Sequence, residues 1–412
     1  MTMNNTEHSL SETDERVIIY LFLCTLGASF LIPYKIYPYF TFLLISTILV
    51  VTFFVVKKIG GAVFFVFHCL YVFWGVGVYL FSREYSNDDF AIKMMMNSLL
   101  LISFSLLFSK IIIRRKILDI IFIFIFFIIF INLIQILYDY ASYDLWHLPF
   151  NLDNSASSDV LNETPRLIGE QNKNIWASKV VLLYSIFSVI FFRTGKKQRK
   201  QRLLYISCSV LCLLFLWLSC SRTAQVLYVM IIFIQILLGD YTSKRYKFFL
   251  ILIVVISFLF AISLQSERYQ DISFTEISSG HNGDGFKARL ILWATLLVAL
   301  PNFSINEILF GHGILYAQNL KGWVFTESNL HNVFLNMFVD LGFVGVLLYT
   351  GSLLCFFLML CRSDVRGAVC LFTPLIFCML VQYTGYDFDL SSYLVLSLMV
   401  INGSKSLKRL NE

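Results

Sequence analysis

The chain has 412 residues, of which 58% are hydrophobic and 17% aromatic, and its mean hydropathy is +0.76. Long apolar runs with few charges exceed what a soluble core of this size needs, so the composition excludes an ordinary soluble protein and indicates a protein of the lipid bilayer. The net charge of +6 does not indicate nucleic acid as a partner, because the basic residues lie between the apolar runs, where membrane orientation explains them.

A membrane-spanning helix needs about 20 apolar residues. The first segment, 1–16, is polar and lacks a cleavable signal, so the first apolar run is expected to remain as a span. In chain order the apolar runs predict an all-α, polytopic membrane protein with about twelve transmembrane helices. The predicted spans lie near 17–33, 37–56, 61–82, 92–109, 117–137, 175–193, 203–219, 223–239, 248–264, 332–360, 367–384 and 388–402.

The segments that connect these runs fall into two classes by charge. The basic class comprises 57–58, 110–116, 196–202, 244–247, 362–366 and 405–409. The other class is acidic, mixed or nearly uncharged, and comprises 83–91, 138–174, 220–222, 265–331 and 385–387. With about twelve spans the two classes alternate and both termini fall with the basic class, which the positive-inside rule places in the cytoplasm.

Three parts of the chain follow from this order. Residues 1–264 form an N-terminal membrane bundle with an outer loop at 138–174, residues 265–331 form a larger outer loop, and residues 332–412 form a C-terminal membrane segment of three helices. Inside the larger loop, FKARLILWATLLVAL at 286–300 is apolar at helical spacing, too short to span, and followed by Pro301. It predicts an interfacial helix that lies along the membrane.

Two arginines are candidate ligands of an anion. Arg222 lies between two apolar runs with almost no loop, at the outer membrane face, where an arginine is costly unless it has a partner. Arg289 lies on the predicted interfacial helix. Each could simply contact lipid headgroups or pair helices, but a guanidinium also matches phosphate in a bidentate way, so the two could clamp one anion.

His331 is the candidate catalytic residue. It lies where the long outer loop enters a span, and Asn332, Asn336 and Asp340 follow at intervals of four residues, which places them on one helix face. An imidazole with an unperturbed pKa of about 6.5 can accept a proton near neutral pH. Because an intramembrane aspartate is rarely idle, we predict that His331 is a catalytic or substrate-orienting residue and that Asn332 and Asp340 support it.

Further candidates are less specific. Glu327, Lys321 and Arg166 could contact a sugar or a phosphate, and Lys179, near the start of a span, could line the same cavity. His312, between two glycines, is expected to form part of a turn.

Some chemistries have no motif in this chain. The nine cysteines lie in or beside apolar runs and are expected to be buried free thiols rather than metal ligands or disulfides. The sequence contains no phosphate-binding glycine loop, zinc-type histidine pair or nucleophile elbow. No metal and no cofactor are therefore expected.

Three motifs together resemble the O-antigen ligase and polymerase superfamily of bacterial envelope enzymes. They are Ser221-Arg222 at the start of a span, the stretch from Ala288-Arg289-Leu290 through Leu309-Phe310-Gly311-His312-Gly313, and His331-Asn332 followed by the LGFVG sequence at 341–345. They cover roughly the second half of the chain, while the first half is similar only in hydropathy. The sequence WVFTES at 323–328 looks like the enteric-type ligases, and polymerases often lack the histidine at this point.

The resemblance implies a GT-C-like membrane glycosyltransferase that needs neither metal nor nucleotide. Such an enzyme transfers O-antigen from undecaprenyl diphosphate to lipid A–core at the periplasmic face of the bacterial inner membrane, in lipopolysaccharide biosynthesis. Arg222 and Arg289 match the family's arginines that hold the donor diphosphate, and His331 matches its essential loop histidine. Two alternatives remain: an O-antigen polymerase, which joins lipid-linked repeat units, and a transporter of lipid-linked glycans.

Overall fold

The structure is a computed structural model, and it describes residues 12–31, 62–108, 115–147, 173–193, 199–238, 248, 251–252, 285–320, 323 and 329–409. Within these ranges every regular element is a helix. The α-helices are α1 (Glu12–Leu31), α3 (Ala62–Phe81), α4 (Asp88–Phe108), α5 (Arg115–Tyr143), α7 (Lys173–Arg193), α8 (Arg199–Leu218), α9 (Arg222–Leu238), α12 (Gly285–Ala299), α13 (Ile305–Phe310), α14 (Val333–Val381) and α15 (Phe388–Arg409). Short 3₁₀ turns lie at Leu145–His147, Leu300–Asn302 and Tyr316–Asn319.

Membrane-spanning helices dominate the molecule, as the composition predicts. Among the described residues, six helices are long and apolar enough to cross a bilayer, namely α3, α4, α5, α7, α8 and α14, while α1, α9 and α15 contain shorter apolar stretches. The predicted spans at 37–56 and most of 248–264 lie outside the described residues. The polytopic membrane character is therefore confirmed, and the total of about twelve spans stays a prediction.

The 49-residue helix α14 contains two breaks. The second is at Asp364, whose backbone is extended (φ −167°, ψ 103°). The Asp364 carboxylate accepts a 3.1 Å hydrogen bond from the Gly367 N–H, as an N-cap residue does, and forms an ion pair with Arg193 at the end of α7. The predicted connection at 362–366 is thus present as a sharp helix-to-helix junction.

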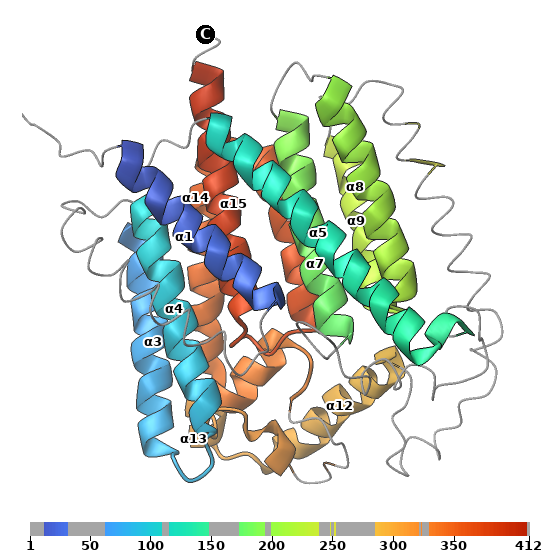
Figure 1. Ribbon diagram of the computed structural model, residues 1–412. Coiled ribbons are helices and arrows are strands. Elements are labelled where there is room, and N and C mark those ends of the chain that lie inside the picture. Colours follow the sequence, from blue (N-terminus) through green and yellow to red (C-terminus); the bar gives the residue numbers. More distant parts are fainter. Residues whose placement is uncertain are drawn as a thin grey trace, which may run out of the picture.

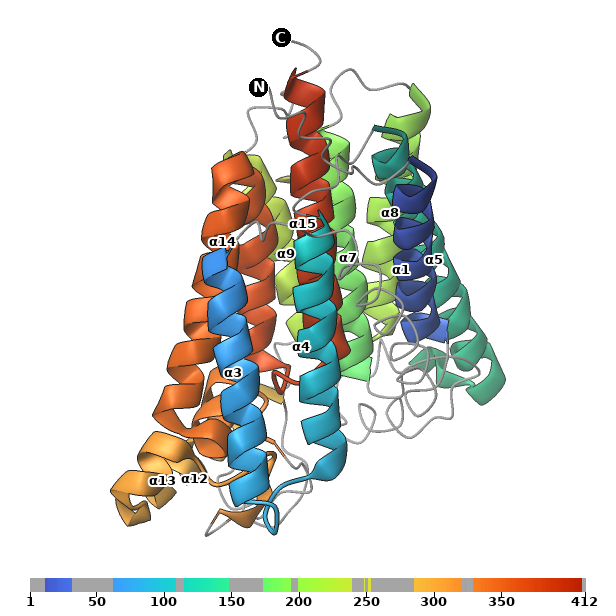
Figure 2. The same ribbon diagram turned by 90° about the vertical axis from the view of Figure 1, so that its left-hand side faces the viewer.

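The two ends of α14 lie at the same end of the bundle. The Tyr386 hydroxyl, just beyond α14, donates a 2.7 Å hydrogen bond to Asp340 near its beginning. Ser221, before α9, donates to Asn174 at the start of α7 at that same end, which we call the loop end. In Figure 1, α12 and α13 lie at this end, and Figure 2 shows the same arrangement from the side.

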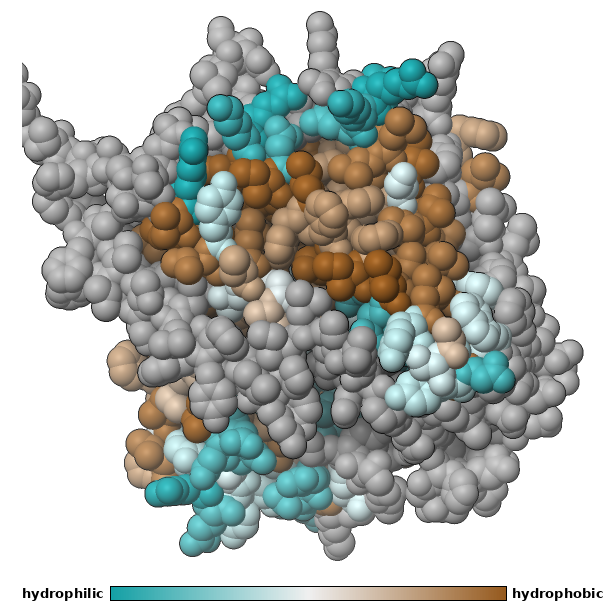
Figure 3. All heavy atoms as spheres, in the orientation of Figure 1, coloured by the Kyte–Doolittle hydropathy of each residue, from teal (hydrophilic) through white to brown (hydrophobic). Residues whose placement is uncertain are grey.

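The opposite end of the bundle carries the described basic connections 199–202 and 362–366, and we call it the basic end. Here Arg193 meets Asp364, and the Gln201 amide lies 3.4 Å from the Asp119 carboxylate. On the face seen in Figure 3, a broad hydrophobic belt lies between hydrophilic residues at the two ends. Among the described residues, 199–202 and 362–366 of the basic class thus lie at one end, and 220–222 and 385–387 of the other class lie at the opposite end, as the alternation predicts.

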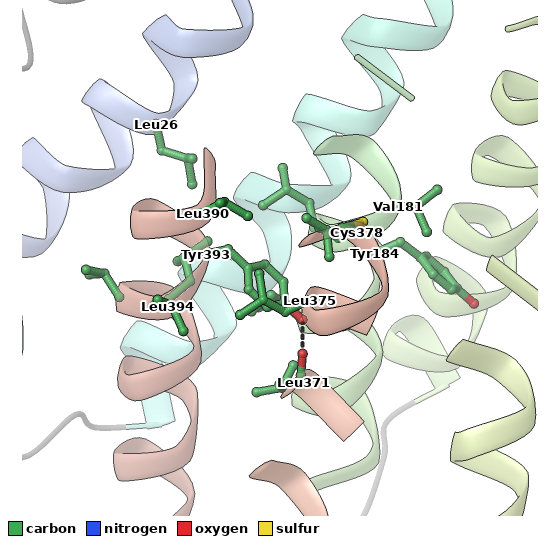
Figure 4. Packing of buried hydrophobic residues seen from close by; sticks show 14 of the residues in the cluster. Leu26, Val181, Tyr184, Leu371, Leu375, Cys378, Leu390, Tyr393 and Leu394 are labelled. Atoms are coloured by element: carbon green, nitrogen blue, oxygen red, sulfur yellow. Dashed lines mark hydrogen bonds between the residues drawn. The ribbon is translucent and has the colours of Figure 1, made fainter. Parts of the chain in front are cut away.

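Helix α7 forms the centre of the bundle. Its residues are almost all buried, and α5, α8, α9, α14 and α15 pack around it. Figure 4 shows part of this core, in which the Tyr393 hydroxyl donates a 2.9 Å hydrogen bond to the Leu371 carbonyl oxygen. All nine cysteines are free thiols, but the expectation of burial is wrong for Cys24, which is exposed, and five others are only partly buried.

The first break in α14, at Gly342, joins the helix to the loop before it. The carbonyl oxygens of Val339 and Asp340 accept 3.0 Å hydrogen bonds from the backbone N–H groups of His312 and Gly313. The Leu341 carbonyl oxygen accepts a 2.9 Å bond from the Trp74 indole on α3. Carbonyl groups that lose their helical partners need new donors, and the loop and α3 supply them.

Helix α12 lies across the loop end of the bundle (Figure 1). Its Leu292, Leu296 and Ala299 pack with Leu330 and Val339 in a hydrophobic cluster separate from the main core. The other face leaves Leu297 and Val298 exposed by 69% and 72%. A helix that is apolar on both its packed and its exposed face suits the predicted position along the membrane surface.

Two glycines make the junction at Gly342 feasible, and replacing Gly342 by alanine tests this. Gly311 (φ 79°) and Gly342 (φ 70°) both adopt backbone conformations that only glycine tolerates. A Cβ at Gly342 would lie 2.3 Å from the Leu309 carbonyl oxygen. We expect Gly342→Ala to lower the free energy of unfolding by about 2–4 kcal/mol, measured by thermal or denaturant unfolding in detergent. Gly77→Ala is the control, because a Cβ there meets nothing within 4 Å, and equal stability of the two variants would contradict the proposed role of the junction.

Candidate active site

Arg289 links three elements at the loop end. Its Nη1 donates a 3.1 Å hydrogen bond to the Thr223 hydroxyl in the first turn of α9. Its Nη2 donates a 3.0 Å bond to Oε1 of Gln382, which follows α14. The residue is only 8% exposed, so a guanidinium is held inside the protein by two neutral acceptors.

The charge of Arg289 has no compensating anion in the part of the chain that the structure describes. No carboxylate among those residues lies within 4.0 Å of it, and burial lowers its pKa to about 10 because the charged form is poorly solvated. With this pKa the guanidinium remains protonated at neutral pH. A buried, protonated cation with no carboxylate partner among the described residues is a favourable place for an anionic ligand.

Arg222 begins α9 directly before Thr223 and is partly buried. The chain reaches it through a tight turn in which Cys220 has a positive φ of 50°. Because Arg289 binds the residue next to Arg222, the two predicted arginines lie on neighbouring elements. The N-terminus of α9 adds its positive dipole end to the same place.

The backbone of Leu330 fixes the approach to His331. The Leu330 N–H donates a 2.9 Å hydrogen bond to Oδ1 of Asn336, and its carbonyl oxygen accepts a 2.9 Å bond from the Trp293 indole. Leu330 itself is fully buried. Both backbone polar groups of Leu330 are therefore satisfied. These two hydrogen bonds fix the position of the backbone from which His331 follows.

His331 is partly buried and has a positive φ of 49°, which is uncommon for a residue with a side chain. Its N–H donates a 2.8 Å hydrogen bond to Oδ1 of Asn329. The next residue, Asn332, caps α14, because its Oδ1 accepts bonds from the N–H groups of Phe334 (3.0 Å) and Leu335 (3.1 Å). The His331-Asn332 pair therefore marks the point where the loop turns into the helix.

Helix α12 carries one of the three main candidates and contacts the chain neighbours of the other two. Arg289 and Trp293 are four residues apart and lie on one face of this helix. At this spacing their Cβ atoms are roughly 6 Å apart. Arg289 binds the neighbour of Arg222, and Trp293 binds the neighbour of His331. One turn of α12 thus relates both arginines to the histidine.

Asp340 serves the junction at Gly342. Its Oδ1 accepts a 3.0 Å hydrogen bond from the Tyr316 N–H, and its Oδ2 accepts the Tyr386 hydroxyl. Its backbone oxygen accepts the Gly313 N–H. The carboxylate therefore fastens the loop and the α14–α15 connection to one point, which gives a structural reason for an aspartate in an apolar helix.

Lys179 lies in a different place from the arginines. Its ammonium group is 3.2 Å from the Asp389 carboxylate and donates a 3.1 Å hydrogen bond to the Ser29 carbonyl oxygen. A small cavity adjoins this ion pair between α1, α7 and α15, and neither arginine nor His331 lines it. Among the remaining predicted residues, Glu327, Lys321 and Arg166 lie outside the described part of the chain.

His312 forms part of a turn, as expected. Its ring stacks on that of Tyr316 at 4.4 Å and meets the edge of Phe303 at the same distance. Nδ1 lies 3.5 Å from the Glu307 carboxylate. Burial lowers the pKa of His312, and Glu307 only partly opposes this effect, so the ring packs as a neutral group.

The sequence alone does not single out Thr223, Gln382 or Trp293 as residues of the site. The signal for Trp293 was present, since it lies one turn after Arg289 on the same helix face. Thr223 and Gln382 belong to other elements, and only the packing of α9, α12 and the α14–α15 connection brings them to Arg289.

Comparison with known families supports the same region. Residues 207–350 match the family model described as O-antigen ligase. The matched segment contains Arg222, Arg289 and His331, and it confirms the resemblance to the O-antigen ligase and polymerase superfamily. No curated protein sequence matches the chain.

The hydrogen bond from the Trp293 indole to the Leu330 carbonyl oxygen, which we call the Leu330 anchor, can be tested with Trp293→Phe. Phenylalanine keeps the aromatic packing but leaves the Leu330 carbonyl oxygen without its donor, so we expect a loss of about 1–3 kcal/mol in unfolding free energy. A shift of His331 by about 1 Å would lower glycan transfer by roughly 10²-fold. Trp146→Phe, at an exposed tryptophan on the 3₁₀ turn after α5, should change neither quantity. Normal stability and transfer in Trp293→Phe would show that the anchor is dispensable.

Proposed function

We propose that the protein is an O-antigen ligase, a membrane glycosyltransferase that transfers O-antigen polysaccharide from undecaprenyl diphosphate to the lipid A–core acceptor. The family match supports an O-antigen ligase-family role, and the ligase rather than the polymerase reaction is our inference. It is supported by His331 and by the WVFTES sequence at 323–328, whose resemblance is to ligases. The proposed reaction uses neither a metal nor a nucleotide.

The observation that carries the proposal is the state of Arg289. Two other cations of the bundle, the partly buried Arg193 and the buried Lys179, have carboxylate partners: Arg193 pairs with Asp364, and Lys179 pairs with Asp389. Arg289 instead contacts two neutral acceptors, which use two of its five N–H groups. The remaining donors, and a charge that meets no carboxylate in the described part of the chain, suit a diphosphate, which a guanidinium binds with charge-assisted hydrogen bonds.

The chemistry needs few groups. A sugar hydroxyl of the acceptor attacks the anomeric carbon of the donor, the bond from that carbon to the diphosphate oxygen breaks, and undecaprenyl diphosphate leaves with the electron pair. In our proposal Arg289 and Arg222 stabilise the negative charge that develops on this oxygen, an effect worth about 3–4 kcal/mol for one well-placed donor. His331 accepts the proton of the attacking hydroxyl, and such base catalysis contributes roughly 10²–10⁴-fold.

The architecture suits a lipid-borne donor. Arg222, Arg289 and His331 lie at the loop end of the bundle, away from the basic end. By the positive-inside rule the basic end would face the cytoplasm, together with both termini, and the site would face the periplasm. The prenyl chain of the donor could then remain in the bilayer while its diphosphate reaches the ends of the spans.

The lipopolysaccharide pattern of a deletion strain tests the proposal. Loss of a ligase leaves long glycan chains on the lipid carrier, so we expect lipid A–core without O-antigen on a gel and a lipid-linked pool of long chains. Loss of a polymerase would instead leave single repeat units attached to lipid A–core. That second pattern would replace our proposal by the polymerase alternative, and a loss of lipid-linked glycan from the periplasmic side would favour a transporter.

Complementation of the same strain tests the three residues. We expect Arg222→Ala, Arg289→Ala and His331→Ala each to lower transfer by about 10²-fold or more, at normal protein level and membrane insertion. Arg222→Lys should restore activity only in part, since the bidentate geometry is lost. Arg199→Ala, at an exposed arginine of the basic end, is the matched control and should retain activity. Full transfer by His331→Ala would remove this residue from the mechanism.

A further inference from the structure

We infer that Gln382 is a positioning residue for donor binding, which orients the Arg289 guanidinium without neutralising its charge. The inference rests on the proposed function, in which Arg289 binds the donor diphosphate. It concerns a residue outside the matched family segment, which ends at 350.

The first observation is the geometry of the Gln382 amide. Its Oε1 accepts a 3.0 Å hydrogen bond from Nη2 of Arg289, and the residue is only 2% exposed. A guanidinium donates hydrogen bonds and accepts none, so the amide must present its oxygen to it. Together with the bond from Nη1 to Thr223, this contact fixes the plane of the guanidinium.

The second observation is the dense hydrogen bonding of the segment that follows Gln382. Asp387 Oδ2 accepts hydrogen bonds from the N–H and the hydroxyl of Thr384 and from the Gly385 N–H. The Tyr386 carbonyl oxygen accepts a 2.7 Å bond from Asn97 on α4, and the Tyr386 hydroxyl binds Asp340. Gln382 therefore occupies a position defined by contacts with α4 and α14, and not by its own side chain alone.

The third observation is the allocation of nearby carboxylates. Asp387 binds the turn, Asp340 binds Tyr316 and Tyr386, and Asp389 pairs with Lys179. The residue that accepts the Nη2 hydrogen bond of Arg289 is a neutral amide, although a glutamate of nearly the same shape would bind the guanidinium more strongly. A carboxylate there would satisfy the arginine internally, and a diphosphate would have to displace it and be repelled by it.

A neutral amide at this position predicts an unusual order of mutational effects. If Gln382 had only a structural role, Gln382→Glu would be the mildest change, because glutamate accepts the same hydrogen bond. If Gln382 positions an uncompensated cation, Gln382→Glu must be among the most damaging changes for donor binding, while the fold stays intact. Gln382→Met, which fills similar space without an acceptor, should affect stability more and donor affinity less.

The experiment measures binding of undecaprenyl diphosphate, which carries the diphosphate and the prenyl chain but no glycan, to the full-length protein in detergent. For Gln382→Glu we expect a dissociation constant raised by at least about tenfold and a melting temperature equal to or above that of the wild type. In transfer assays the KM for the lipid-linked donor should rise more than kcat falls. Gln318→Glu adds the same charge at an exposed site in the 3₁₀ turn Tyr316–Asn319. This control variant should leave the dissociation constant and the KM for the donor unchanged.

A second variant keeps the test decisive if Gln382→Glu fails to fold. Thr223→Asp places a carboxylate beside the other terminal nitrogen of Arg289, in the first turn of α9, where an acidic residue favours the helix. It should weaken donor binding in the same way.

The outcomes separate the inference from the proposed function. Wild-type affinity in Gln382→Glu and Thr223→Asp, together with lost affinity in Arg289→Ala, would overturn the inference and leave the proposed donor site intact. Wild-type affinity and transfer in Arg289→Ala would overturn the donor site itself.

Discussion

The break in α14 at Gly342 is the constraint on which the loop end depends. A helix that changes direction leaves carbonyl groups without partners, and inside an apolar bundle these groups must find donors. Here the N–H groups of His312 and Gly313 and the indole of Trp74 supply them. Because the donors come from the loop before α14 and from α3, the break attaches the loop to the bundle, and this attachment in turn holds α12 and the His331 segment in place.

The two ends of the bundle differ in the partners that they give to a cation. At the basic end Arg193 is neutralised by the carboxylate of Asp364, which also caps a helix, so its charge is used to stabilise the fold. Arg289 has comparable burial but is given a hydroxyl and an amide. Burial of a cation without an anion costs free energy, and among the described residues no carboxylate pairs with Arg289, which suits the binding of an anionic ligand at this cation.

The sequence predicts the framework of this molecule better than its contacts. Apolar runs and basic connections anticipate which connections share an end, because lipid and charge act on each segment separately. The roles of Asp340 and Gln382 could not be predicted from the sequence, because they depend on partners far away in the chain. The partner of Asp340 is Tyr386, and the partner of Gln382 is Arg289. Asp340 shows the point clearly, because its position on the helix face suggested support of the histidine, whereas its carboxylate holds the loop and the α14–α15 connection.

Helix α12 relates the two chemical roles through its own geometry. Arg289 and Trp293 are one turn apart on a rigid helix, and each binds the neighbour of another candidate residue, Arg222 in one case and His331 in the other. A displacement of α12 would therefore disturb the contacts of both the proposed anion ligand and the segment that carries the proposed base. The exposed apolar face of the same helix, with Leu297 and Val298, suits the membrane surface, so the lipid that carries the donor would also support the helix that positions both groups.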